Sequence, residues 1–490
     1  MLFNSIDFLI FFIFVLSIIV ILKNRNYQHF FLLCASYFFF YFSSNYLITL
    51  LLFSTILDFY VAKMIWKTPS KQKKKILLII SLIGNLGLLG FFKYADFAIV
   101  QFNILGNYFD LASDIQLLNL LLPIGISFYT FQTISYTVDV YRGKLEPSKS
   151  LKEFALFVSF FPQLVAGPIV RASEFLPQLR KKLEKIDGIS KLKQIKIHSN
   201  NLKLGITIMA FGFLKKMFFA DNIAPLVNHI FSDPVGLDSL SIMLGALAFG
   251  IQIYGDFSGY SDIAIGAALI LGFKLPINFN KPYFAISPSD FWQRWHISLS
   301  SWLRDYLYIP LGGNRKKPSR TYLNLAMVMI LGGLWHGASW NFIIWGMLHA
   351  VYLIFHKLIL DKFPTFQNNL FFKSKIGTLI SILVTQYFIF LAWIPFRADN
   401  LDHAIYSIQK FILFDFQTNG IVPLILEYKL SVVLIILFIF LHAISYKKHN
   451  IVEQISKLKL RYWTMILIVI LASIVFFYDG NSGDFIYFRF

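Results

Sequence analysis

Residues 376–395 read IGTLISILVTQYFIFLAWIP and contain no Lys, Arg, Asp or Glu. About 20 such residues allow an α-helix to cross the hydrocarbon core of a bilayer. Comparable apolar runs occupy residues 3–22, 76–92, 430–445 and 463–478. Across the 490 residues, 57% are hydrophobic and 14% are charged, with a mean hydropathy of +0.63. The sequence therefore predicts an all-α polytopic membrane protein that forms a single domain, residues 1–490.

The positions of the basic residues predict how the chain threads the membrane. The net charge is +19, and Lys and Arg gather in blocks of the kind that mark cytoplasmic loops. These blocks are residues 63–75, 142–152, 171–203, 304–320, 357–375 and 447–461. Residues 221–238 contain no Lys or Arg and are expected outside. Threading the apolar runs between the blocks gives about twelve crossings, with both termini extracytoplasmic. The crossings are expected to begin near residues 3, 29, 46, 76, 117, 203, 239, 321, 341, 376, 428 and 462.

Two apolar stretches, residues 154–169 and 257–303, lie between blocks that are expected on the same side of the membrane. We interpret both as re-entrant or interfacial segments. Such segments are tolerated where protein or a water-filled cavity satisfies their backbone groups, which predicts a hollow on the cytoplasmic side. Residues 175–203 add apolar residues at helical spacing among Lys and Arg, which predicts an interfacial helix or a simple anchor on anionic headgroups.

Several classes of function are excluded by what the sequence lacks. The basic blocks alternate with apolar runs and contain few aromatic residues, so nucleic-acid binding is not expected. The single cysteine, Cys34, excludes an intramolecular disulfide and a cysteine-rich metal site. The sequence contains no P-loop, no Gly-rich dinucleotide fingerprint and no metalloprotease helix motif. We therefore expect no bound metal and no bound cofactor.

His336 is the first candidate for chemistry, because it lies in LGGLWHGASWNFIIWG, residues 331–346. Ionisable groups at bilayer depth usually face a cavity or a partner, although a hydrogen-bonded core histidine is the alternative. The other polar and aromatic residues concentrate in residues 123–143, 161–171 and 254–341. The further candidates for the site are His296, Arg294, Arg304, Asp305, Asn341, Trp335, Asp256, Tyr254 and Gln163.

Structural interpretations compete with these functional ones. Arg294, Arg304 and Asp305 are equally well explained as ion pairs at the cytoplasmic rim. Trp292, Trp295 and Trp302 favour an interfacial aromatic belt over ligand stacking. The pairs Gly255/Gly259 and Gly333/Gly337 have the small-xxx-small spacing that indicates close helix packing.

At this point the motifs resemble a known family. WQRWHISLSSWLRDYLYIPLGG, residues 292–313, is followed by LWHGASWNFIIWG, residues 334–346, and together they are similar to the membrane-bound O-acyltransferases. Residues 123–143, 160–171 and the terminal FIYFRF, residues 485–490, extend the resemblance over most of the chain. It implies a ring of about 12 helices around a central funnel. It also implies that His336 is the catalytic histidine and His296 the second histidine of the family.

The resemblance points to the bacterial branch that acylates cell-envelope polymers from the cytoplasmic membrane. It implies acetyl-CoA as the donor and O-acetylation of a polysaccharide. Of the 45 basic residues, 34 are Lys, as in chains from AT-rich genomes. Alginate producers tend to have GC-rich genomes, so peptidoglycan is favoured as the polymer. Alginate or another exopolysaccharide, and teichoic acid D-alanylation, remain alternatives. A non-enzymatic transporter or flippase is the rival from another class.

The resemblance and the topology together suggest a mechanism. Neutral His336 is expected to accept the proton of an acceptor hydroxyl. Asn341 or a backbone amide near Gly337 is expected to stabilise the oxyanion. The tail, residues 479–490, is expected outside, where Tyr487 is a candidate acyl relay to an extracytoplasmic, esterase-like partner. The alternative is that the tail only folds back and plugs the outer funnel.

Overall fold

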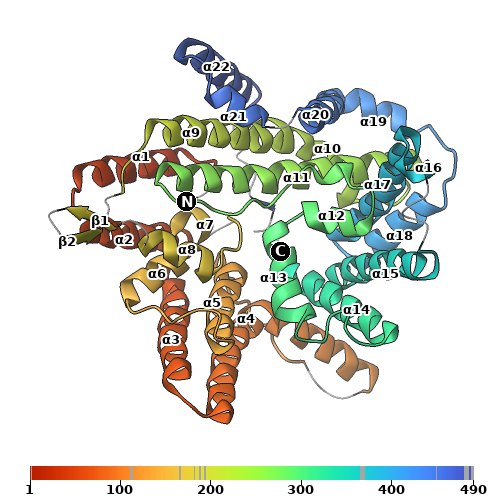
Figure 1. Cartoon of the computed structure of the whole chain (residues 1–490). Helices are drawn as coiled ribbons and strands as arrows, with labels where there is room; N and C mark the ends of the chain where they lie inside the picture. Colours follow the sequence, from red (N-terminus) through yellow and green to blue (C-terminus); the bar gives the residue numbers. More distant parts are fainter. Residues whose placement is uncertain are drawn as a thin grey trace. The chain divides into compact units, whose positions relative to one another are not determined.

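The computed structural model describes the chain except residues 2, 111–113, 165–166, 181–182, 187–188, 193–194, 365–369, 449, 479–484 and 487–490. Helices dominate the described residues, as expected for an all-α protein, and one two-stranded hairpin accompanies them (Figure 1). The chain divides into two compact units, residues 1–206 with 263–276 and residues 207–262 with 277–490. Two of its three boundaries fall inside the helices Ser199–Phe213 and Ser239–Ile270, and for this reason the sequence pattern indicates no boundary there.

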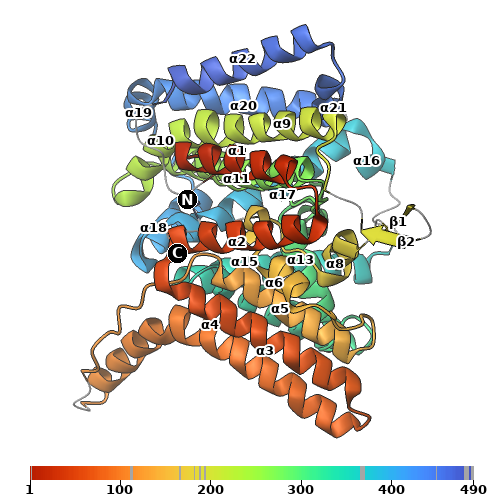
Figure 2. The same ribbon diagram turned by 90° about the vertical axis from the view of Figure 1, so that its left-hand side faces the viewer.

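The first unit contains the N-terminal helices. Its elements are α1 (Ile6–Ile21), α2 (Arg25–Ser44), the 3₁₀ turn η1 (Asn45–Leu47), α3 (Ile48–Lys67), α4 (Lys71–Tyr108), α5 (Ile126–Tyr141), α6 (Leu151–Ser159), α7 (Phe161–Leu164), α8 (Ala172–Arg180), β1 (Leu183–Ile186) and β2 (Ile189–Leu192). Helices α3, α4 and α5 lie side by side (Figures 1 and 2). The buried carboxylate of Asp58 on α3 joins them, since it accepts hydrogen bonds from Ser81 and Asn85 on α4 and from Thr137 on α5. Paired polar groups of this kind can be buried among apolar helices.

The second unit follows, starting within α9. Its elements are α9 (Ser199–Phe213), the π-helical η2 (Leu214–Ala220), α10 (Asp221–Ser232), α11 (Ser239–Ile270), η3 (Pro282–Phe284), α12 (Pro288–Arg294), α13 (Ile297–Leu303), η4 (Arg304–Tyr308), α14 (Pro318–His336), α15 (Trp340–Lys362), α16 (Leu370–Lys373), α17 (Lys375–Arg397), α18 (Leu401–Ile412), α19 (Ile421–Glu427), α20 (Lys429–Lys447), α21 (Ile451–Ser456) and α22 (Leu460–Phe476). The helices α14 and α15 form a tightly packed antiparallel pair.

Six helical segments of the described chain are long and apolar enough to cross a membrane. They are residues 25–67, 71–108, 239–270, 340–362, 375–397 and 429–447. Two shorter apolar helices, α1 and α22, accompany them. Large apolar side chains remain exposed along these helices, including Ile376, Leu379 and Leu383 on α17. Contiguous exposed apolar surface on this scale fits contact with lipid.

The structure differs locally from what the sequence patterns predict. Residues 257–303 are not one element, because residues 257–270 complete α11 and short helices follow only after residue 281. The interfacial helix predicted over residues 175–203 ends at Arg180, and a hairpin follows in which Leu183 pairs with Leu192. In the sequence, Asp187-Gly188 lies between these strands, and such a dipeptide favours hairpins over helices. Near residue 117, where a crossing was expected, helix α5 begins only at Ile126.

Candidate active site

His336 is the last residue of α14, where the helix meets α15. Glycines bring the two helices together: a Cβ on Gly346 would lie 2.6 Å from the carbonyl oxygen of Met329. The chain leaves the helix at Gly337, which has an extended backbone. His336 therefore lies at the turn between two closely packed helices.

His296 lies between α12 and α13 in an unusual backbone conformation. Its φ and ψ are 43° and 52°, in the left-handed region that residues with a Cβ rarely adopt. Asn278 holds the segment that follows. Its carbonyl accepts from the Ile297 N–H at 2.9 Å, and its side-chain Oδ1 accepts from the Ser298 hydroxyl at 2.6 Å. The Asn278 amide in turn donates to the Ser261 hydroxyl on α11 at 3.1 Å. Strained residues held in this way concentrate at functional sites.

The two histidines predicted for the site lie together. The centroids of the His296 and His336 rings are 6.4 Å apart, and both side chains are buried. Trp335 contacts both, with its ring centroid 6.0 Å from His296 and 5.1 Å from His336. Phe257 on α11 packs edge-on against His296 at 4.6 Å. The fold thus brings together two histidines that are forty residues apart in the sequence.

A third histidine, His349, extends this cluster and was not among the residues predicted from the sequence. Trp345 packs against His336 at 5.0 Å and against His349 at 4.7 Å. Both ring nitrogens of His349 and the indole nitrogens of Trp292 and Trp345 are buried without a hydrogen-bond partner among the described residues. Buried polar atoms normally have partners, so water or substrate is expected beside them. The signal was available, because His349 is an ionisable residue in the apolar part of the 23-residue helix α15.

The charged candidates form ion pairs. Arg294 pairs with Asp290 one turn earlier on α12, at 2.7 Å. Arg304 makes two hydrogen bonds to Asp305, at 2.7 and 3.2 Å, and its side chain is 62% exposed. Arg294, Arg304 and Asp305 are therefore all members of ion pairs, and their place at the cytoplasmic rim stays a prediction.

The remaining candidates are distributed as follows. The amide nitrogen of Asn341 donates to the carbonyls of Ala398 at 2.7 Å and Asn400 at 3.3 Å, so it holds the end of α17 and is not directed at an oxyanion. Tyr254 is buried against Trp295 and His442. Gln163 belongs to the first unit, where it donates to the Phe157 carbonyl.

Two of the tryptophans predicted for an interfacial belt are instead buried in the second unit. Trp295 is 1% exposed and stacks on Phe291 with centroids 5.6 Å apart. Trp302 is also buried. The belt prediction is therefore wrong for these two residues, because their aromatic surface is covered by protein.

Asp256 on α11 connects the site to the C-terminal tail. Its Oδ1 pairs with the Lys216 ammonium at 2.6 Å, and its Oδ2 accepts from the backbone N–H of Ile486 at 2.7 Å. Phe485 is fully buried against Tyr260, with ring centroids 4.2 Å apart. These two tail residues are therefore packed into the second unit. Tyr487 lies outside the described residues.

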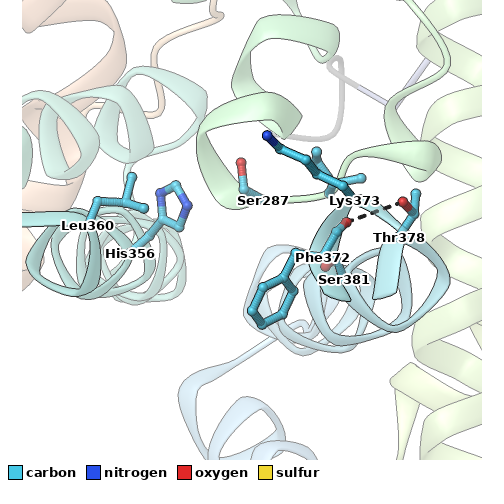
Figure 3. Close-up of a pocket in the computed structure, with 8 residues that line it drawn as sticks. Ser287, His356, Leu360, Phe372, Lys373, Thr378 and Ser381 are labelled. Carbon is cyan, nitrogen blue, oxygen red and sulfur yellow. Dashed lines mark hydrogen bonds between the residues drawn. The ribbon is translucent and has the colours of Figure 1, made fainter. Parts of the chain in front are cut away.

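A cavity of ≈ 340 Å³ lies at the ends of α15 and α17 (Figure 3). His356 and Leu360 line one side and Lys373, Thr378 and Ser381 the other, next to the basic block 357–375 that is predicted to be cytoplasmic. This cavity is therefore a candidate for the hollow that the sequence predicts on the cytoplasmic side. Neither His296 nor His336 is among its lining residues.

Apolar helices around buried, adjacent imidazoles define a multi-pass membrane protein equipped for proton transfer. Residues 148–394 match the membrane-bound O-acyltransferase family, and this range includes His296, His336 and Asp256. The chain belongs to this family and is an acyltransferase, as its motifs suggested.

Curated relatives carry more specific names. A peptidoglycan O-acetyltransferase of Helicobacter pylori is 40% identical over 73% of this chain and 68% of its own length. A probable alginate O-acetylase of Azotobacter vinelandii is 42% identical over 69% of this chain and 62% of its own length. A teichoic acid D-alanyltransferase of Bacillus subtilis is 29% identical over 58% of this chain and 71% of its own length. The chain thus spans less than two thirds of the alginate relative.

Proposed function

We propose that this protein passes acetyl groups from cytoplasmic acetyl-CoA through the bacterial cytoplasmic membrane for the O-acetylation of peptidoglycan. The observation that carries the proposal is the pair of buried imidazoles, His336 and His296, with ring centroids 6.4 Å apart inside the region that matches the family. The 40% identical Helicobacter pylori relative bears the name peptidoglycan O-acetyltransferase, which supports the choice of peptidoglycan as the polymer.

In the proposed first step, neutral His336 takes the proton of the Tyr487 hydroxyl. The phenolic oxygen attacks the thioester carbonyl carbon, and the carbon–sulfur bond breaks. The imidazolium then returns the proton to the departing thiolate, so that free coenzyme A leaves and O-acetyl-tyrosine remains. General-base assistance of this kind typically contributes about 10² to 10⁴ in rate. An aryl ester is activated enough to pass its acetyl group onward to a hydroxyl.

The proposed route of the donor follows one face of α15. Trp345, His349, Tyr352 and His356 are spaced at four, three and four residues, which places them on the same side of the helix. His356 lines the cavity, and Trp345 contacts His336. Because the described cavity stops short of His336, aromatic side chains along this face must move before the thioester reaches the base.

The proposed route of the acetyl group ends at the C-terminal tail, on the extracytoplasmic side. We propose that an extracytoplasmic, esterase-like partner takes the acetyl group from Tyr487 and transfers it to the polymer. With both termini outside, as the basic blocks predict, the acetyl group crosses the membrane while the carrier stays in the cytoplasm.

Two measurements test the proposal. Cells that carry His336→Ala are expected to lose peptidoglycan O-acetyl groups at an unchanged level of the membrane protein, whereas His198→Ala, at an exposed histidine, retains them. Intact-mass analysis of purified protein incubated with acetyl-CoA is expected to show one acetyl adduct of about 42 Da, which Tyr487→Phe abolishes. Normal O-acetylation in the His336→Ala cells would favour a transporter and reject the enzyme.

Alginate is the second candidate polymer, because the Azotobacter vinelandii relative is 42% identical to this chain. The same His336→Ala cells distinguish the two. Loss of acetyl groups from an exopolysaccharide with peptidoglycan unchanged would move the assignment to that polymer, and loss of D-alanine from teichoic acid would move it to D-alanyl transfer.

A further inference from the structure

The buried Lys216–Asp256 pair is not explained by the chemistry of acetyl transfer. Lys216 is 2% exposed and contacts two carboxylates, Asp256 at 2.6 Å and Asp221 at 2.7 Å. Buried ion pairs contribute little to stability on average, so their retention calls for another reason. Here the carboxylate has a second function, because its other oxygen holds the Ile486 N–H.

The contacts around Asp256 place the tail on one face of α11. Asp256, Phe257 and Tyr260 are consecutive or one turn apart on that helix, and all three contact the tail. Phe485 contacts the rings of Phe257 and Tyr260, at centroid distances of 6.0 and 4.2 Å. Phe257 in turn contacts His296 at 4.6 Å. A single aromatic ring therefore separates the tail from the histidine pair.

The depth of this contact is informative. Asp256 is the eighteenth residue of α11, which starts at Ser239 beside a loop predicted to be extracytoplasmic. At 1.5 Å per residue, the contact lies about 25 Å along the helix from that end. Phe485 and Ile486 thus pack beside the middle of α11.

We propose that Asp256, oriented by Lys216, is a positioning residue that anchors the C-terminal segment through the Ile486 N–H, beside the aromatic ring that packs on His296. The consequence for acetyl transfer rests on the proposed function of Tyr487. The anchor itself rests only on the contacts of Phe485 and Ile486. A hydrogen bond from a backbone N–H to a carboxylate is among the stronger ones in proteins, and it fixes the main chain at the position just before Tyr487.

The experiment compares two double variants in the same background. Lys216→Met with Asp256→Asn removes both charges but keeps an acceptor oxygen, whereas Lys216→Met with Asp256→Leu keeps the branched shape in a larger side chain and has no acceptor. Hydrogen exchange of the C-terminal peptide, followed by mass spectrometry in detergent or nanodiscs, reports on the Ile486 N–H. We expect exchange at least about tenfold faster in the Leu variant than in the Asn variant. Peptides from α14 and α15 are expected to exchange equally in both, which separates loss of the anchor from general unfolding.

Two further variants keep the result interpretable. Phe485→Ala removes the ring that packs on Tyr260 without touching the ion pair, and it is expected to release the tail as well. Asp262 lies on α11, as Asp256 does, and pairs with Lys215 on η2 at 2.6 Å. Asp262→Asn breaks this pair and is expected to leave tail exchange unchanged. Equal protection of the tail in the Asn and Leu variants would overturn the anchor.

Acetyl transfer provides the second readout and separates the two proposals. If Tyr487 is the acceptor, the Leu variant is expected to lower kcat at least about tenfold with little change in KM for acetyl-CoA, and the Asn variant to restore part of the rate. A released tail with an unchanged kcat would uphold the anchor and reject the relay through Tyr487. A protected tail in the Leu variant would reject the anchor whatever the activity of Tyr487→Phe.

Discussion

At the scale of single residues, the conformation of His296 is the sharpest feature of the site. A residue with a Cβ in the left-handed region costs about 1–2 kcal/mol, and Asn is among the few that tolerate it. Replacement by Asn therefore removes the imidazole and leaves the backbone in a conformation that the new residue tolerates. Replacement by Ala removes the imidazole and retains the strain.

We predict that His296→Asn and His296→Ala both lower acetyl transfer by about 10² or more, because the imidazole is lost in each. We also predict that the Ala variant unfolds at a lower temperature than the Asn variant. Acetyl-CoA turnover and thermal unfolding in detergent measure the two effects. An Asn variant with near-normal turnover would show that the imidazole of His296 has no part in the reaction.

The residues of the site were predictable to different degrees. His336 and His296 follow from the motifs and from the rule that ionisable groups in apolar runs have a function. Asn278 could not be found this way, because a lone Asn in a loop gives no sequence signal for the three hydrogen bonds it accepts from the segment after His296. The ion pairs of Arg294 and Arg304 required coordinates, since side-chain geometry decides between a rim pair and a substrate contact.

At the scale of elements, close packing of α14 and α15 positions His336. A Cβ on Gly346 would lie 2.6 Å from the Met329 carbonyl oxygen and 2.9 Å from the Ile330 Cα, which are backbone atoms that cannot move aside. Gly87 on α4 is also helical but has no atom within 4 Å of the added Cβ. The two glycines therefore form a matched pair.

We predict that Gly346→Ala destabilises the protein by about 1–3 kcal/mol, as overpacking does, and lowers acetyl transfer through displacement of His336. We predict that Gly87→Ala is neutral or stabilises by up to about 1 kcal/mol, because Ala favours helix. Thermal unfolding of both purified variants is the measurement. Equal unfolding temperatures would mean that α14 and α15 can move apart to accept the added methyl group without loss of stability.

The elements also show what a sequence pattern can and cannot predict. Long apolar helices such as α4, α17 and α20 follow directly from hydropathy. The continuation of α11 to Ile270 does not, because Gly255, Gly259 and the charged Asp256 and Asp262 interrupt the apolar pattern there. These residues face partners that only the fold supplies. A Cβ on Gly259, for instance, would lie 2.7 Å from the Gly212 carbonyl.

At the scale of the second unit as a whole, two carboxylates tie the start of α11 to the segment between α18 and α19. The hydrogen bond from Lys410 lowers the pKa of Asp415 to about 2, with help from the N–H groups of Gln417 and Ser239. Burial opposes ionisation of Asp238, but hydrogen bonds from Ser241, Gly420 and Ile421 outweigh it and hold the pKa of this carboxyl below its usual value. Both groups lie outside the candidate membrane spans.

A carboxyl whose pKa is lower in the folded than in the unfolded protein stabilises the fold above the unfolded value of about 3.9. We predict that this contribution of Asp415 disappears as the pH falls from about 4 to about 2. Asp415→Asn is therefore expected to unfold at a lower temperature than wild type at pH 7, with the difference shrinking below pH 4. Thermal scans at pH 7, 4 and 3 measure it, with Asp402→Asn on α18 as the control. A difference that stays constant with pH would assign the effect to packing and not to charge.

The same contacts bear on the orientation of the chain in the membrane. The positive-inside rule places residues 221–238 outside, and the same threading puts the residues between the crossings that begin near 376 and 428 on that side. In the structure Asp238 accepts from the N–H groups of Gly420 at 2.9 Å and Ile421 at 3.1 Å, so the two segments are in contact. In a Cys34→Ser background, we predict that a membrane-impermeant thiol reagent labels Val235→Cys and Thr418→Cys in intact cells. It is expected to label Lys457→Cys only after permeabilisation. If the pattern is reversed, the tail faces the cytoplasm, and transfer from Tyr487 to an extracytoplasmic partner becomes impossible even if the histidines catalyse acetyl transfer.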